Sequence, residues 1–279
     1  MFAGLRIASP GYNREVTEVA ELGRRWRGEL EAWAIPEEIL ARAPVDPWGH
    51  IVTRFTRRTD ALLAAPGGPT YERVCEALPD GGTLLDVGAG TGAASLPAVR
   101  ARGARLVAVD ENGGMLERLG ELEPGARLIR GRWPDVAGET PVADVAMCAH
   151  VVFNVPDLPE FFAALTAHAR RRVVVELPEL HPTTWAAPLW RHFHGIERPS
   201  RPTSYDAAAI AAALGHDVRD DAHEAPDDPF TSVEELAASA CRRLCLDPGR
   251  AGEVAEAAVA LGVWPVPRAR RHTLTWDVR

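Results

Sequence analysis

One short segment of this chain constrains the fold more strongly than any other. Leu84–Val87 is an apolar run containing a single acid, Asp86, and it leads directly into the sequence Gly-Ala-Gly-Thr-Gly at residues 88–92. Glycines between a strand and a helix let the backbone bend tightly, and they let a ligand approach the main chain because no Cβ stands in the way. The segment therefore predicts a strand, a ligand-binding turn and a helix in succession.

The chain after this turn alternates between short apolar runs and helical stretches. Apolar runs without polar alternation are typical of parallel strands that are covered on both faces. The first five predicted strands are Thr83–Val87, Arg105–Val109, Arg127–Arg130, Val142–Ala149 and Arg172–Leu177. The pattern predicts a doubly wound, Rossmann-like α/β fold.

Two acids at strand ends distinguish between possible ligands. Asp86 stands two residues before the first glycine, where the pyrophosphate of a dinucleotide would meet a like charge. Asp110 ends the second strand, twenty residues past Gly90, where an acid can accept hydrogen bonds from both ribose hydroxyls. A ligand that carries an ammonium group and a ribose fits both acids. A dinucleotide remains the alternative, because residues 88–93 also match Gly-x-Gly-x-x-Gly/Ala.

Together with the glycine turn, two further motifs resemble class I S-adenosylmethionine-dependent methyltransferases of the small-molecule branch. Asp110–Leu116 is similar to the family's Asp-x-Ser-x-x-Met-Leu, in which the methionine packs against adenine. Cys148–Asp157 is similar to the family's segment after the fourth strand, with its His-x-x-x-x-Val-Pro-Asp pattern. The resemblance covers about Leu84–Leu177, and it implies S-adenosylmethionine as the cofactor.

The segment after the third strand departs from the family pattern. Family members usually carry Gly-Asp there, and the acid binds the adenine amino group, whereas this chain has Arg132 and Trp133 after its glycine. Adenine would instead be held by main-chain groups and by stacking near Trp133, or by Asp135. The cofactor-binding residues implied by the resemblance are Asp86, Gly88, Ala89, Gly90, Asp110, Glu111, Met115, Arg132, Trp133 and Ala149.

The resemblance also implies a sheet of seven strands, the last two of them antiparallel. The polar segment His216–His223 and the alternating segment Arg271–Val278 are the candidates for these strands, and the second suits an edge or near-edge position. The first 80 residues have helical periodicity. The predicted domains are an N-terminal helical cap at 1–80 and an S-adenosylmethionine-binding domain at 81–279, with inserts at about 178–204 and 225–267.

One histidine is the candidate catalytic residue. His150 follows the fourth predicted strand, at the carboxyl edge where open α/β sheets bind ligands. Its unperturbed pKa of about 6.5 would allow it to take a proton from a hydroxyl or an amine. Alternatively, it only forms hydrogen bonds with the cofactor or with a neighbouring loop. The side chains expected to cover the same edge are Trp48, His50, His181, Trp185 and Trp190.

Composition excludes several other functions. The formal net charge of −8 disfavours nucleic acid as a partner. An apolar run of about 20 residues, as needed to cross a membrane, is missing. We expect a cytoplasmic protein, because the first residues lack the basic start and apolar core of a secretory signal. The four cysteines lack the spacing of a zinc site, and we expect no metal.

The sequence thus favours methyl transfer to an oxygen, nitrogen or carbon atom of a small, largely neutral or apolar molecule. In-line displacement needs mainly alignment and desolvation, and it needs a base only when the nucleophile must lose a proton. Two alternatives stay open. An NAD(P)-dependent dehydrogenase would share the glycine turn, but the carboxylate of Asp86 disfavours this alternative. A regulatory or structural protein would bind S-adenosylmethionine without catalysis.

Overall fold

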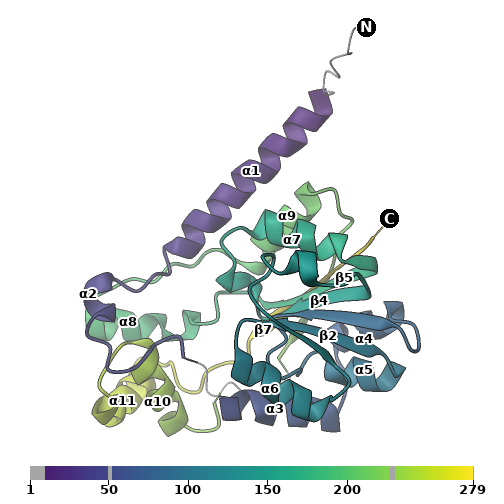
Figure 1. Ribbon diagram of the computed structural model, residues 1–279. Coiled ribbons are helices and arrows are strands. Elements are labelled where there is room, and N and C mark those ends of the chain that lie inside the picture. The colour runs from purple at the N-terminus through teal and green to yellow at the C-terminus, as the bar shows by residue number, and fades with distance from the viewer. Residues whose placement is uncertain (1–9, 50–51, 226–229, 279) are drawn as a thin grey trace, which may run out of the picture.

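The computed structural model describes residues 10–49, 52–225 and 230–278, and its strands form one seven-stranded sheet (Figure 1). The strand order is β3-β2-β1-β4-β5-β7-β6. The order reverses between β1 and β4, which is the point at which open α/β sheets bind ligands. The strands are β1 (Thr83–Val87), β2 (Arg105–Asp110), β3 (Arg127–Arg130), β4 (Ala143–Ala149), β5 (Ala169–Pro178), β6 (Arg219–Glu224) and β7 (Arg270–Asp277).

The strand directions match the sequence expectation. β1 to β5 pair in parallel, and β7 pairs antiparallel with both β5 and β6. β6 and β7 are antiparallel to each other, but β6 runs in the same direction as β1 to β5, so only β7 opposes the rest of the sheet. β7 lies next to the edge of the sheet, as its alternating sequence predicted. The predicted Rossmann-like α/β fold is confirmed.

Helices cover both faces of the sheet (Figure 1). α4, α5 and α6 pack on one face in a core that includes Leu84, and α1, α7 and α9 pack on the other in a core that includes Leu85. These neighbours in β1 enter different cores because successive side chains of a strand point to opposite faces. Of the described helices, none combines the length and the apolar composition needed to cross a membrane. The helices are α1 (Pro10–Glu31), α2 (Glu37–Leu40), α3 (Val52–Ala64), α4 (Pro69–Ala77), α5 (Leu96–Arg102), α6 (Gly113–Leu122), α7 (Leu158–Ala167), α8 (Ala187–His194), α9 (Ser204–Ala213), α10 (Val233–Arg243) and α11 (Ala251–Ala260).

A third core lies beside the sheet and is built from the two predicted inserts. It joins Trp190 of α8, Leu236 of α10 and Val254 of α11, and Ile35 from the segment after α1 packs into it. Figure 1 shows α8, α10 and α11 grouped together with α2 on one side of the molecule. The described part of residues 1–80, which the sequence presented as one helical region, is thus shared among three cores.

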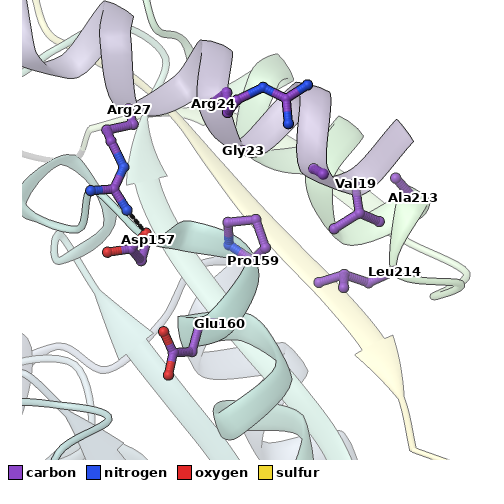
Figure 2. Close-up of a pocket in the computed structure, with 10 residues that line it drawn as sticks. Val19, Gly23, Arg24, Arg27, Asp157, Pro159, Glu160, Ala213 and Leu214 are labelled. Carbon is purple, nitrogen blue, oxygen red and sulfur yellow. Dashed lines mark hydrogen bonds and ion pairs between the residues drawn. The ribbon is translucent and has the colours of Figure 1, made fainter. Parts of the chain in front are cut away.

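α1 approaches α7 closely at Gly23. A Cβ on Gly23 would lie 2.9 Å from Cγ of Pro159, which explains a glycine in the middle of a long helix. Figure 2 shows Gly23 opposite Pro159, with Arg27 of the same helix ion-paired to Asp157. The groove at this contact is lined by residues of α1, of α9 and of the start of α7, none of which is a predicted site residue.

Candidate functional site

The glycine turn after β1 has a conformation that glycine adopts readily and other residues do not. The φ angles of Gly88, Gly90 and Gly92 are 71°, 53° and 83°. A Cβ on Gly88 would lie 2.3 Å from Cγ2 of Val151, and one on Gly92 would lie 2.7 Å from Cδ1 of Leu96. A Cβ on Gly90 would meet no atom within 4 Å. Packing therefore requires two of the glycines, while Gly90 borders open space.

Asp86 is a buried carboxylate without a partner. Its side chain is 1% exposed, and neither oxygen has a hydrogen-bond partner among the described residues. Burial raises the pKa of Asp86 to about 7; the nearby hydroxyl of Ser95 opposes this rise, and the charge of Asp110 adds to it. An unpaired buried carboxylate is costly, and a ligand ammonium group would offset that cost. The residue therefore fits the amino end of S-adenosylmethionine.

Asp110 links the end of β2 to the glycine turn. Its Oδ2 accepts the N–H of Gly90 at 2.8 Å, and its Oδ1 accepts the N–H of Asn112 at 2.8 Å. Each carboxylate oxygen has two lone pairs, so both oxygens can still accept a hydrogen bond from a ribose hydroxyl. The carboxylate thus stabilises the turn and remains suited to a ribose.

The other predicted residues of the cradle lie around this carboxylate. Ala89 is buried, and its N–H donates to the carbonyl of Val109 at 3.1 Å. Glu111 is exposed directly after β2. Met115 is 3% exposed in the first turn of α6, where its N–H donates to the capping side chain of Asn112 at 3.2 Å.

The two residues after β3 lie in different environments. Arg132 is exposed. The ring of Trp133 is only 5% exposed and packs edge-on against His168, with 4.9 Å between the ring centroids. His168 immediately precedes β5, at the opposite end of that strand from the ligand-binding edge. This placement argues against stacking of adenine on Trp133, and it leaves main-chain groups or the exposed Asp135 as the expected contacts.

His150 lies at the carboxyl edge, as predicted, next to Ala149, the last residue of β4. Its backbone has a φ of 62°, which is unusual for a residue with a side chain. Its N–H donates to the carbonyl of Glu176 at 2.8 Å. The imidazole is 27% exposed, and its Nε2 lies 2.8 Å from Oε1 of Glu176 and 2.9 Å from Nη2 of Arg58.

Glu176, on β5, is a site residue that the sequence analysis missed. Its side chain is 9% exposed, and its Oε2 accepts the hydroxyl of Thr70 at 2.6 Å. Burial alone would raise the pKa of Glu176, but the contact with His150 and the charges of Arg271 and Arg58 hold it below its usual value. A lone acid after three valines was the available signal, because an ionised side chain is rarely buried without partners.

Arg58 was also missed, and α3 brings it to the site. The next residue, Thr59, lies on the glycine turn, with its Oγ1 2.7 Å from Oγ1 of Thr91. Nη2 of Arg58 reaches His150 at 2.9 Å and Oε1 of Glu176 at 3.5 Å. The pKa of His150 is lowered first by burial and next by the Arg58 charge, and the contact with Glu176 opposes both. No sequence motif marks Arg58, because its role depends on how α3 packs.

The side chains that were expected to cover the carboxyl edge of the sheet lie in different environments. His181 stacks on Trp33 with 4.0 Å between the ring centroids, and burial, assisted by Arg198 and Arg243, lowers its pKa to about 3. Trp190 is buried in the core of the inserts. Trp185 packs edge-on against Phe230, Trp48 is 44% exposed beneath Arg243, and His50 lies outside the described residues.

Within the described ranges, no group of three or more His, Cys, Asp or Glu side chains is arranged to hold a metal ion. Cys241 and Cys245, which share a helical spacing, are free thiols in the core of the inserts. Burial raises the pKa of both thiols.

The comparisons with known proteins agree with the fold. A family model described as a methyltransferase domain matches residues 56–217, a range that contains most of α3 and the strands from β1 to β5. A search of curated proteins gave no significant match.

Solved structures show the same fold at low sequence identity. A putative sarcosine dimethylglycine methyltransferase from Galdieria sulphuraria has a TM-score of 0.52 at 14% identity, covering 92% of this chain and 98% of that one. A cyclopropane-fatty-acyl-phospholipid synthase-like protein from Lactobacillus casei has a TM-score of 0.52 at 16% identity, covering 86% and 98%. A putative methyltransferase from an antibiotic biosynthesis pathway of Anabaena variabilis has a TM-score of 0.50 at 15% identity, covering 74% and 95%.

Proposed function

We propose that this chain, which belongs to the S-adenosylmethionine-dependent methyltransferase family, acts on a small-molecule acceptor bound at the carboxyl edge of its sheet. The observation that carries this proposal is the unpartnered, buried carboxylate of Asp86 beside the open space at Gly90. Family membership favours methyl transfer over the dehydrogenase alternative, and a carboxylate at this position suits an ammonium rather than a pyrophosphate.

In this proposal, different residues of the chain bind different parts of the cofactor. Asp86 pairs with the ammonium group, the open side of Gly90 accommodates the methionine part, and Asp110 accepts hydrogen bonds from the ribose hydroxyls. The bound cofactor supplies a methyl group on a sulfonium. The cradle aligns that methyl group with the nucleophile of the acceptor, which is the main requirement of an in-line displacement.

His150 is proposed as the base or orienting group for the acceptor. A partly exposed imidazole lies at the carboxyl edge of β4, the strand next to β1. Its lowered pKa keeps the ring neutral near neutral pH, and a neutral imidazole can accept a proton from a hydroxyl or an amine.

The surroundings of the edge favour a small acceptor over a polymer. Trp33, Phe153 and His181 pack together close to the end of β5, and the helices of the two inserts form a separate core beside them. In this proposal, these rings shield the acceptor from water, which favours an acceptor with apolar surface. The formal charge of −8 disfavours a nucleic acid.

The test combines binding and transfer. Calorimetry with S-adenosylmethionine, S-adenosylhomocysteine and NAD should show binding of the first two and no binding of NAD. Incubation with S-adenosyl-L-[methyl-³H]methionine and pooled small phenols, amines and carboxylic acids should then label at least one compound, and mass spectrometry should find a gain of one methyl group. Labelled RNA or DNA, with the small molecules unlabelled, would contradict the proposal. Tight cofactor binding without transfer to any acceptor would favour the non-catalytic alternative.

A further inference from the structure

Two groups compete for one nitrogen of His150. Nη2 of Arg58 can only donate a hydrogen bond, so at 2.9 Å it requires a lone pair on Nε2. Oε1 of the ionised Glu176, at 2.8 Å, can only accept, so it requires a proton on the same Nε2. A neutral imidazole satisfies one of these partners at a time. The position of Arg58 therefore determines which tautomer His150 adopts.

Of the two partners of Nε2, Arg58 is held less firmly than Glu176. Glu176 is held in place by the hydroxyl of Thr70, which donates a hydrogen bond to its Oε2 at 2.6 Å. Its Oε1 is approached at 3.5 Å by Arg58 and at 3.5 Å by Arg271. Arg58 is 27% exposed, and no carboxylate among the described residues lies closer to it than this 3.5 Å contact. A guanidinium prefers short, bidentate contacts with a carboxylate, so Arg58 is suited to a further anion.

α3 places this guanidinium near the glycine turn. The contact between Thr59 and Thr91 fixes the helix on the glycine turn, one residue away from Arg58. The two acids of the cradle, Asp86 and Asp110, are suited to an ammonium group and to hydroxyls. Neither suits a carboxylate, which like charge would repel.

We propose that Arg58 is the carboxylate-binding residue of this site, and that a bound carboxylate draws it away from His150 so that Nε2–H donates to Glu176. The inference rests on the proposed function. The carboxylate belongs either to the methionine end of the cofactor or to the acceptor, and the chemistry that Arg58 recognises is the same in both cases.

The switch converts His150 from a donor into a base toward the acceptor. When Arg58 donates a hydrogen bond to Nε2, the proton of the neutral ring resides on Nδ1. When Nε2–H donates to Glu176 instead, Nδ1 carries the lone pair. When the nucleophile of the acceptor forms its bond to the methyl group, its proton passes to Nδ1, and the resulting imidazolium is stabilised by Glu176 until solvent removes the proton. The site thus acquires its base only when a carboxylate is bound.

Nitrogen-15 NMR of the histidine side chains tests the switch without any turnover, with the His150 signals assigned from His150→Gln. In the ligand-free protein, we expect the proton of the neutral ring on Nδ1. Adding S-adenosylhomocysteine, alone or together with glycine or benzoate, should move it to Nε2. The inference is overturned if none of these ligands moves it.

Substitutions of the two competitors should act in opposite directions. The charged groups that face His150 are Arg58 on α3, Glu176 on β5 and Arg271 on β7. Arg58→Gln should place the proton on Nε2 without any ligand and raise the pKa of His150, whereas Glu176→Gln should lower that pKa further. Glu179→Gln, just beyond β5, is the matched control, because its carboxylate contacts His272 and Arg270 instead. Equal titration of His150 in all four proteins would overturn the inference.

Binding distinguishes the two sources of the carboxylate. If the cofactor supplies it, Arg58→Gln should weaken S-adenosylhomocysteine by about ten- to a hundredfold and leave decarboxylated S-adenosylmethionine unaffected. If the acceptor supplies it, both cofactor analogues should bind Arg58→Gln as they bind the wild type, and benzoate or glycine should switch the tautomer only in the wild-type complex. Arg118→Gln, on an exposed face of α6, is the control for loss of a positive charge. A failure to find methyl transfer leaves these readouts intact, so the two proposals fail separately.

Discussion

The two halves of the carboxyl edge differ in how their chemistry is distributed along the chain. On the β1 and β2 side, the turn and both acids lie within Asp86–Asp110: the turn follows β1 directly, Asp86 lies near the end of β1, and Asp110 is the last residue of β2. The β4 and β5 side is built from five separate elements or loops, which meet only in the folded protein. They contribute Arg58, Thr70, His150, Glu176 and Arg271.

This difference corresponds to two different tasks, the binding of the cofactor and the positioning of the acceptor. A cradle for one fixed ligand can be built from two consecutive strands with the turn and helix between them, because backbone geometry and two carboxylates suffice. The proposed acceptor side would have to position a proton-accepting group against the acceptor, which requires side chains held by several elements. Substitutions on the first side should therefore affect cofactor binding, and those of His150 and Glu176 on the second should affect protonation and turnover.

The largest expected effect comes from Gly90→Val. The new side chain would occupy the open space beside Gly90, so cofactor binding should be lost while the protein stays folded. Calorimetry with S-adenosylhomocysteine and circular dichroism measure the two properties. Gly103→Val is the matched control, because Gly103 has a φ of 55° and open surroundings at the end of α5. Wild-type affinity in folded Gly90→Val would contradict the assignment of the turn.

Asp86→Asn should weaken cofactor binding and yet stabilise the ligand-free protein. The pKa of Asp86 rises from 3.8 in the unfolded state to about 7 in the folded state. Between about pH 4 and pH 7, Asp86 is therefore protonated in the folded protein and ionised in the unfolded chain. Stability therefore falls as the pH rises from about 4 to 7, by up to about 4 kcal/mol, and asparagine should remove this fall. Urea unfolding at pH 5 and pH 8 measures it. A variant less stable than the wild type at pH 8 would show that Asp86 has a partner in the free protein.

Asp110→Ala should weaken S-adenosylhomocysteine by about 1.5 to 3 kcal/mol, because it removes hydrogen bonds to a charged group. Asp144→Ala is the control, since Asp144 accepts the N–H of Thr83 at 2.8 Å at the opposite end of β1. Calorimetry should find the control unchanged. Equal affinities for Asp110→Ala and the wild type would remove Asp110 from the cofactor site.

Particular residues show how far the sequence could be interpreted. The bounds of β1 and β3 and the positions of Asp86, Asp110 and His150 followed from local patterns, because a strand end fixes the direction of the residues that follow it. Burial of Trp133 against His168 did not follow, since it depends on packing between segments distant in sequence. The roles of Arg58 and Glu176 depend likewise on contacts between α3, β4 and β5.

The N-terminal region and the inserts give the same lesson at a larger scale. Helical periodicity predicted that the first 80 residues are helical, but it carries no information about which core each helix joins. Ile35, a few residues after α1, packs among the insert helices, whereas Val74 of α4 packs beneath the sheet. The division of the first 80 residues among several cores is therefore a property of the folded chain.

The smallest expected effects test whether α1 belongs to either half of the edge. Gly23→Ala should destabilise the protein by about 1 kcal/mol, because its Cβ would lie 2.9 Å from Pro159 and the helix must shift (Figure 2). Gly28→Ala, on the same helix with nothing within 4 Å, should instead stabilise it by about 0.5 to 1 kcal/mol. Urea unfolding gives both values. The affinity for S-adenosylhomocysteine should be unchanged in both variants, since the cradle lies between β1 and β2. A weaker affinity in Gly23→Ala alone would show that the position of α1 influences the cradle, and the division of the edge into two independent halves would then be wrong.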